Sequence, residues 1–142
     1  MTRKLRILLV NEVHYLNTGY AVYGRNLLQK LYTSQKYDIA ELGLYSQFNN
    51  PLITNAPWRI YSNLPTNKDE ENEYNSDICN QFSAYRLGDV ILDFHPDIII
   101  SINDHWQYEC VVNHPLTQYC HWVVMPAVDS SALQDCLLEN LT

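Results

Sequence analysis

The chain has 142 residues, 46% of them hydrophobic and 12% aromatic, which predicts one folded domain rather than a disordered segment. Its formal net charge is −7, and all nine Lys and Arg residues lie in residues 1–86. Residues 87–142 contain eight acidic residues and no Lys or Arg. This composition argues against electrostatic binding of nucleic acid through this half, because its charges repel the phosphate groups. The acidic half is either a solvated face or a surface for a basic partner or a second domain.

No apolar run approaches the ~18 residues that a membrane-spanning helix needs, and the first residues lack a signal-peptide pattern. We therefore expect no transmembrane segment and a cytoplasmic location. Cys79, Cys110, Cys120 and Cys136 include no Cys-x-x-Cys pair, so free thiols in a reducing compartment are expected. Cys110 and His114 alone do not make a zinc site, and no metal is expected.

The chain opens with a strand, a loop and a helix. Residues 4–10 are a nearly continuous run of Leu, Ile and Val, as in a buried parallel strand. A helix with apolar residues at helical spacing starts near Tyr20, with Thr18 as its N-cap. Gly24 inside this helix indicates close packing or a close ligand, because glycine weakens a helix by roughly 1 kcal/mol.

A second strand is predicted over residues 37–45, where apolar and polar residues alternate. Residues 46–76 hold three prolines, seven asparagines and an acidic run, which predicts a loop-rich insert with one short strand at residues 58–61. The elements predicted after it are a helix over 77–94, a strand over 97–102, a short helix over 108–112, a strand over 119–125 and a helix over 130–141.

This alternation predicts an α/β fold over residues 1–142: a Rossmann-like three-layer sandwich with a mainly parallel sheet. In such a sheet the loops after the strands meet at one edge, where ligands bind. The three loops expected there span residues 11–19, 103–106 and 126–131.

The first of these loops ends at the start of a helix, where backbone N–H groups and the helix dipole favour an anion such as phosphate. It has neither a G-x-G-x-x-G motif nor a P-loop, so an ordinary capped helix is the alternative. The candidate substrate-binding residues of this loop are His14, Asn17, Thr18, Gly19 and Tyr20.

The other two loops supply the candidate catalytic residues. Asp104 and His105 directly follow a buried strand, where a carboxylate and an imidazole can serve as a base and a hydrogen-bonding group. The alternative is that Asp104 caps the next helix and His105 is merely exposed. Asp129 is the candidate of the third loop, with helix capping as its alternative role.

Three segments carry motifs in a consistent order. The first reads LRILLV at 5–10 and NTGYAVYGRNLLQKL at 17–31, the second PDIIISINDHW at 96–106, and the third HWVVMPAVD at 121–129. The first segment resembles a strand, a glycine loop and a G-Y-x-x-Y-x-R-x-L-L helix. The second resembles a P-D-hydrophobic strand, and the third a strand that ends in hydrophobic-x-P-V-D. These belong to GT-B glycosyltransferases of family 4, the glycogen-synthase-like and sucrose-synthase-like group.

The resemblance implies the N-terminal, acceptor-side half of a GT-B architecture. Such an enzyme moves a sugar, with retention of configuration, from a nucleotide-sugar donor to a sugar acceptor, and no cofactor or metal is implied. Gly19 and Tyr20 would approach the donor diphosphate, and Asp104, His105 and Asp129 would lie near the transferred sugar and the acceptor. A C-terminal domain or partner chain would bind the nucleotide, so this chain alone would be inactive.

Two other classes of function remain open. One is a non-catalytic, flavodoxin-like binding or protein-interaction domain, of which the receiver type is one version. That type needs an acidic pair after the first strand and a lysine after the last one, whereas this chain has Asn11 and Glu12 and no lysine after Lys68. The other is a small nucleotide-binding enzyme, which the lack of a phosphate-binding motif disfavours.

Overall fold

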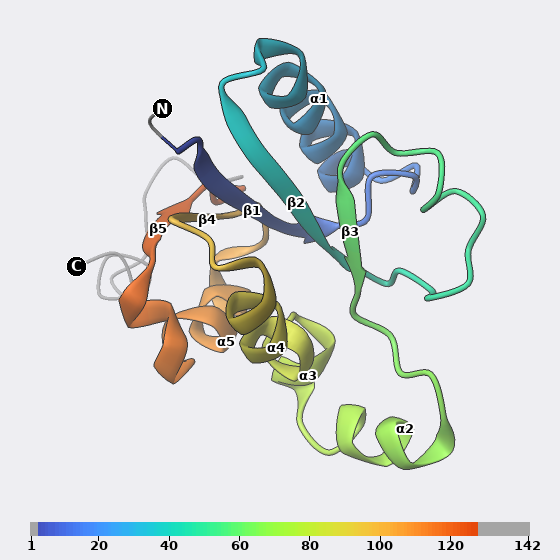
Figure 1. The fold of residues 1–142 in the computed structure, drawn as a ribbon. Coiled ribbons are helices and arrows are strands. Elements are labelled where there is room, and N and C mark those ends of the chain that lie inside the picture. The colour runs from blue at the N-terminus through green and yellow to red at the C-terminus, as the bar shows by residue number, and fades with distance from the viewer. Residues whose placement is uncertain (1–2, 128–142) are drawn as a thin grey trace.

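The computed structural model describes residues 3–127, whose strands form a five-stranded sheet with every pair parallel. The strand order is β3-β2-β1-β4-β5 (Figure 1). The strands are β1 Leu5–Glu12, β2 Tyr37–Leu44, β3 Arg59–Ser62, β4 Ile98–Ser101 and β5 His121–Val124. The helical elements are α1 Gly19–Ser34, α2 Lys68–Tyr74, α3 Ile78–Gln81, α4 Ala84–Phe94, the 3-10 helix η1 His105–Tyr108, α5 Glu109–Val112 and the 3-10 helix η2 Pro115–Tyr119.

The predicted first strand is the centre of the sheet. Ile7 of β1 lies opposite Ile39 of β2 on one side and Ile98 of β4 on the other. Residues 8–10 have no exposed surface, because helices cover both faces of a parallel sheet. The strand runs two residues further than predicted, to Glu12.

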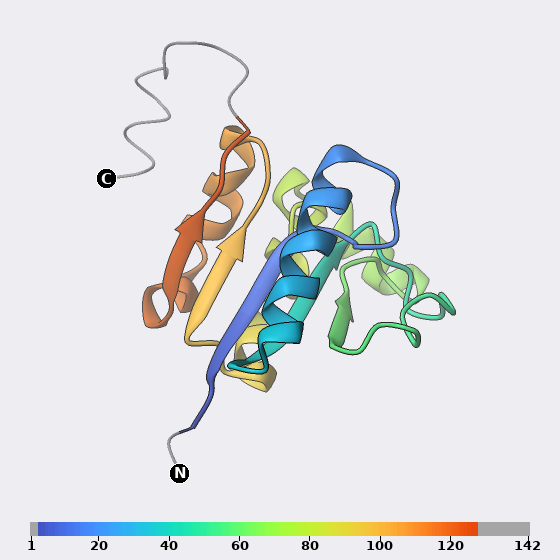
Figure 2. The same ribbon diagram turned by 90° about the horizontal axis from the view of Figure 1, so that it is seen from above.

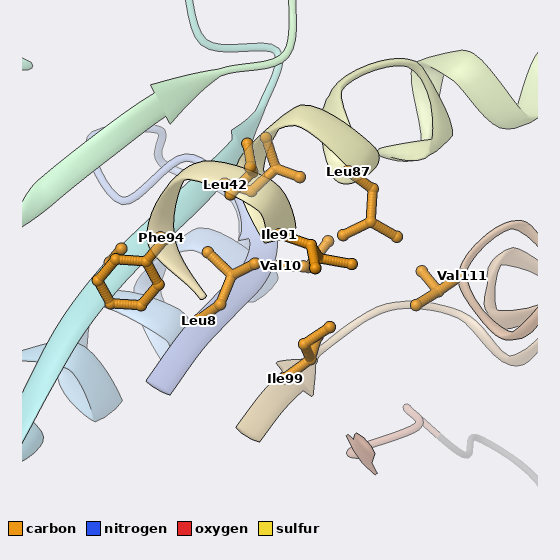
Figure 3. Packing of buried hydrophobic residues seen from close by; sticks show 10 residues of the cluster. Leu8, Val10, Leu42, Leu87, Ile91, Phe94, Ile99 and Val111 are labelled. Atoms are coloured by element: carbon orange, nitrogen blue, oxygen red, sulfur yellow. The ribbon is translucent and has the colours of Figure 1, made fainter. Parts of the chain in front are cut away.

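Helices cover both faces of the sheet (Figure 2). Side chains of β1 alternate, so that Ile7 and Leu9 pack on the α1 side while Leu8 and Val10 pack on the α4 side. The predicted Rossmann-like three-layer sandwich is thereby confirmed. Figure 3 shows the core on the α4 side, where helix and strand residues interdigitate: Leu8, Val10, Leu42, Leu87, Ile91, Phe94, Ile99 and Val111.

The strand order decides between two α/β topologies. The order 3-2-1-4-5 is that of the Rossmann fold, whereas flavodoxin-like sheets have the order 2-1-3-4-5. The observed order matches the Rossmann fold and differs from the flavodoxin-like order. The order reverses between β1 and β4, and open α/β sheets bind their ligands at such a switch point.

Helix α1 begins as predicted. Thr18 is its N-cap, and the Thr18 hydroxyl oxygen accepts a hydrogen bond from the backbone N–H of Ala21 at 3.2 Å. The close packing indicated by Gly24 is also present: a Cβ there would lie 2.0 Å from Asn11 Nδ2. Gly24 is therefore needed so that α1 can approach the end of β1.

The insert at residues 46–76 is mostly turn and loop, as predicted, and supplies the edge strand β3. The sequence prediction missed α2, however. Asn67 caps this helix by accepting the backbone N–H groups of Asp69 and Glu70, and three acidic residues occupy its first turn. Acidic side chains at a helix N-terminus are stabilising, so the acidic run marks a helix start and not a loop.

The single helix predicted over residues 77–94 is wrong, because the chain breaks it into α3 and α4. Ser83 lies between them with a φ of 91°, a left-handed conformation that interrupts helical hydrogen bonding. The apolar period continues across the break, so periodicity alone does not reveal it.

The later elements agree with prediction apart from their ends. β4 lies inside the predicted strand 97–102, and the predicted helix 108–112 is preceded by the 3-10 turn η1. β5 is shorter than predicted because Tyr119 belongs to η2. The helix predicted over 130–141 lies outside the described residues.

The cysteine prediction is wrong for one pair. Cys79 of α3 and Cys110 of α5 form a disulfide, and the fold brings them together across 31 residues of sequence. Cys120 is a free thiol, and burial raises its pKa. Cys136 lies outside the described residues.

Within residues 3–127, no helix combines the length and the apolar character needed to cross a membrane.

Candidate functional site

A cavity of about 430 Å³ opens at the switch point between β1 and β4. It lies between the first turns of α1 and the chain that leaves the carboxyl ends of β4 and β5. This is the place where open α/β sheets bind ligands, so the cavity is the candidate site. Its lining residues are Gly19, Tyr20, Tyr23, Ile102, Met125, Pro126 and Ala127.

A hydrogen bond joins two of the predicted site residues. The Tyr20 hydroxyl donates to Asp104 Oδ1, which ties the start of α1 to the loop after β4. Burial, and then the Asp104 carboxylate, raise the pKa of Tyr20 above its ordinary value, so this phenol stays protonated at neutral pH. Asp104 also has the helix-capping role that was the alternative for this residue. It is the N-cap of η1, and its backbone N–H donates to Gln107 Oε1 at 3.2 Å.

Two buried asparagines at the ends of the central strands have incomplete hydrogen bonding. Asn11 Nδ2 donates to the Tyr20 carbonyl at 2.8 Å, but Asn11 Oδ1 has no partner among the described residues. Asn103 Nδ2 is likewise unpaired in residues 3–127. Both side chains are almost fully buried, at 0% and 1% exposure. Unpaired buried polar groups are rare in native proteins. Neither asparagine lines the cavity, but each adjoins a residue that does: Asn11 bonds the Tyr20 carbonyl, and Asn103 follows Ile102.

The first turn of α1 has an unexpected electrostatic setting. The Thr18 hydroxyl donates to Glu12 Oε2, so the Glu12 carboxylate lies beside this turn, as Asp104 does through Tyr20. The two negative charges offset the positive end of the helix dipole. A neutral polar ligand is therefore favoured over a free phosphate. Gly19 faces open space, and Asn17 is exposed.

His14 is held elsewhere, beside a residue that sequence reasoning missed. Its ring Nδ1 lies 2.8 Å from Glu41 Oε2, and its backbone N–H donates to Glu41 Oε1 at 2.6 Å. Trp58 Nε1 donates to the same carboxylate at 3.0 Å. The available signal is an acidic residue inside a strand. The alternating pattern predicted over residues 37–45 makes it an ordinary polar position.

The remaining predicted catalytic residues have different outcomes. His105 is half-buried as the first residue of η1, directly after Asp104. Asp129 lies outside the described residues. Within residues 3–127, no group of three or more His, Cys, Asp and Glu side chains is arranged to hold a metal ion.

The chain matches no model of a protein family, and no curated protein matches its sequence. Its function is therefore argued from the fold, the cavity and the motifs.

Proposed function

We propose that this chain is the N-terminal, acceptor-side domain of a retaining, nucleotide-sugar-dependent glycosyltransferase of GT-B architecture. Its Rossmann-like sheet is the type of layer from which each half of such an architecture is built. The motifs at residues 5–31, 96–106 and 121–129 support the same assignment.

One observation carries the proposal: the three motif segments, far apart in sequence, wall the same cavity. Gly19 and Tyr20 come from the first segment, Ile102 from the second, and Met125 with its two neighbours from the third. A parallel sheet brings the ends of its strands to one edge, and at this edge the three motif segments line one common cavity. A shared binding site is consistent with their occurrence on one chain.

The charges around the cavity support an acceptor role. Glu12 and Asp104 flank the first turn of α1, and a carboxylate accepts hydrogen bonds from sugar hydroxyl groups. The same charges repel a diphosphate. We therefore assign the donor diphosphate to a second domain or partner chain with basic groups. Asp104 and His105 are the acceptor-side candidates for catalysis.

A cytoplasmic location stays a prediction of this proposal. The Cys79–Cys110 disulfide is of a kind more typical of oxidising compartments. The redox state of these two cysteines in the protein isolated from its native cells tests that prediction.

Calorimetric titration tests the division of labour. We expect a methyl glycoside of glucose, galactose or mannose to bind the chain with a Kd on the order of 1 mM. UDP-glucose and GDP-mannose should bind no more tightly. A micromolar Kd for either nucleotide sugar, or no saccharide binding at all, contradicts the proposal.

The control for this titration uses two tyrosines of α1. Tyr23→Ala changes the cavity wall and should abolish saccharide binding. Tyr32→Ala alters the same residue type on the same helix outside the cavity, and it should leave binding unchanged. Equal losses in both variants would place the saccharide elsewhere.

A further inference from the structure

Glu41 is an acidic residue at a fully buried position of the sheet, where apolar residues are usual. It lies opposite Leu9 in the middle of β2, on the face that α1 covers, and it has no exposed surface. An ionised group at such a position is retained only with full hydrogen bonding, and an apolar residue of similar volume is often more stabilising there. A residue that breaks the local rule in this way marks a functional requirement.

Three N–H groups satisfy this carboxylate, and they come from two different loops. Two belong to His14 in the loop after β1, and the third is the indole of Trp58 after β2. Glu41 thus ties together the loops that leave the carboxyl ends of two neighbouring strands. It fixes the position of His14 and the orientation of its ring.

The bond also sets which ring nitrogen of His14 is free. A carboxylate accepts hydrogen bonds and cannot donate them, so the ring hydrogen lies on Nδ1. Nε2 then carries the lone pair. No hydrogen bond to Nε2 occurs within residues 3–127. The ring keeps 12% of its side-chain surface exposed, against 1% for Glu41.

The surroundings of His14 hold the ring in place from other sides. The rings of Tyr15 and Trp58 both lie edge-on to the imidazole, with centroids 5.5 Å away. Arg25 of α1 donates to the His14 carbonyl at 2.9 Å. Every polar atom of His14 except Nε2 is therefore engaged within the protein.

We propose that Glu41 is a positioning residue that presents His14 Nε2 as a hydrogen-bond acceptor for a hydroxyl group of the sugar acceptor. His14 does not line the cavity, so the acceptor must be long enough to reach from the cavity along the β1–α1 loop. This inference rests on the proposed function, and it names the residue that recognises a hydroxyl at the β1–α1 loop. His14 binds the substrate, whereas Glu41 acts only through His14.

The ring-nitrogen NMR spectrum of the ¹⁵N-labelled chain tests the arrangement without any variant. At pH 8 an ordinary imidazole is neutral. His14, identified by the signal lost in His14→Gln, should show hydrogen on Nδ1 and none on Nε2. Hydrogen on Nε2, whether alone or on both nitrogens, overturns the proposal.

Titration with an oligosaccharide of the sugar that binds most tightly in calorimetry then tests the role, because the acceptor must reach both the cavity and His14. The Nε2 signal should move as the saccharide binds. Glu41→Gln should place hydrogen on Nε2, because the amide offers a donor to Nδ1, and should weaken binding about tenfold. Asp38→Asn makes the same acid-to-amide change at an exposed position of β2 and should change neither.

The outcomes separate this inference from the proposed function. Saccharide binding that leaves Nε2 unmoved overturns the role of His14 and leaves the acceptor cavity intact. A complete absence of saccharide binding overturns both. If Glu41→Gln fails to fold, the wild-type tautomer and the wild-type Nε2 shift decide the question.

Discussion

The carboxyl edge of the sheet has two regions with opposite hydrogen bonding. Over β1 and β2, the buried carboxylate of Glu41 receives three N–H donors. At the switch point between β1 and β4, Asn11 and Asn103 keep unpaired polar atoms within the described residues, beside a cavity of about 430 Å³. The buried polar groups are fully hydrogen-bonded around Glu41 but only partly hydrogen-bonded at the switch point.

The difference indicates that the Glu41 cluster serves mainly as support, with His14 Nε2 as its one group for binding, and that the switch point serves mainly for binding. A saturated buried cluster holds its loops in one arrangement, because any movement leaves charged or polar groups unpaired. A region whose buried groups are incompletely paired is held less firmly by hydrogen bonds, and the candidate cavity lies in this region. We therefore expect substitutions at the Glu41 cluster to change stability most, and substitutions at the switch point to change ligand binding at a smaller cost in stability.

The largest effect is expected for Glu41→Ala. It leaves three buried N–H groups without an acceptor, and it should lower the free energy of unfolding by about 3–5 kcal/mol. Urea denaturation measures the change. Asp38→Ala, on the same strand with 58% of its side chain exposed, should change stability by less than about 0.5 kcal/mol. Similar losses in the two variants would mean that the Glu41 cluster is not a support.

The Cys79–Cys110 disulfide ties α5 to α3. Because α5 directly follows η1, which Asp104 caps, the bond also restrains the loop after β4. Replacing both Cys79 and Cys110 by serine should cost about 3 kcal/mol, from the added freedom of the unfolded chain. Denaturation of the variant, together with a thiol titration of the unreduced wild type, measures this. Reactive thiols at both positions in the wild type would show that the bond does not form.

Gly24→Ala should destabilise the chain by about 2 kcal/mol, since its Cβ would overlap Asn11. In the Asn11→Ala background the overlap is gone. There the same change should stabilise by up to about 1 kcal/mol, because alanine is the better helix former. The double-mutant cycle by thermal denaturation decides: a loss of the same size in both backgrounds removes Asn11 from the account.

Tyr20→Phe has the smallest expected effect on stability, about 1 kcal/mol from the lost bond to Asp104. Because the folded state raises the pKa of Tyr20, the contribution of this phenol to stability is present below pH 10 and declines as the pH rises above it. The variant should therefore lose less stability than the wild type between pH 9 and pH 11. Tyr23→Phe removes an exposed hydroxyl from the same helix and should change the free energy of unfolding by less than about 0.5 kcal/mol.

Much of the fold was readable because it depends on local patterns. The apolar run of β1, the Thr18 cap and the spacing of apolar residues in α1 each predict their own element. The break at Ser83 was not readable, because a left-handed residue leaves the apolar period unchanged. The disulfide depends on a contact across 31 residues, for which sequence spacing has no signal.

The candidate site was predictable only in outline. The topology of a parallel sheet brings Tyr20 and Asp104 to one edge, and the sequence indicated both. The role of Glu41 follows from its burial. The sequence does not show whether this position of the strand faces a helix or solvent, so the role could not be predicted. The partner of His14 could therefore emerge only from the folded chain.

The most direct test of the central claim is a map of backbone amide shifts during titration with the tightest-binding methyl glycoside. The account predicts shifts clustered at the carboxyl edge, at Gly19, Ile102 and Ala127, with little change at Tyr37 and Arg59 near the amino edge. Shifts centred on the amino edge, or none at all, would contradict a sugar acceptor site at the switch point.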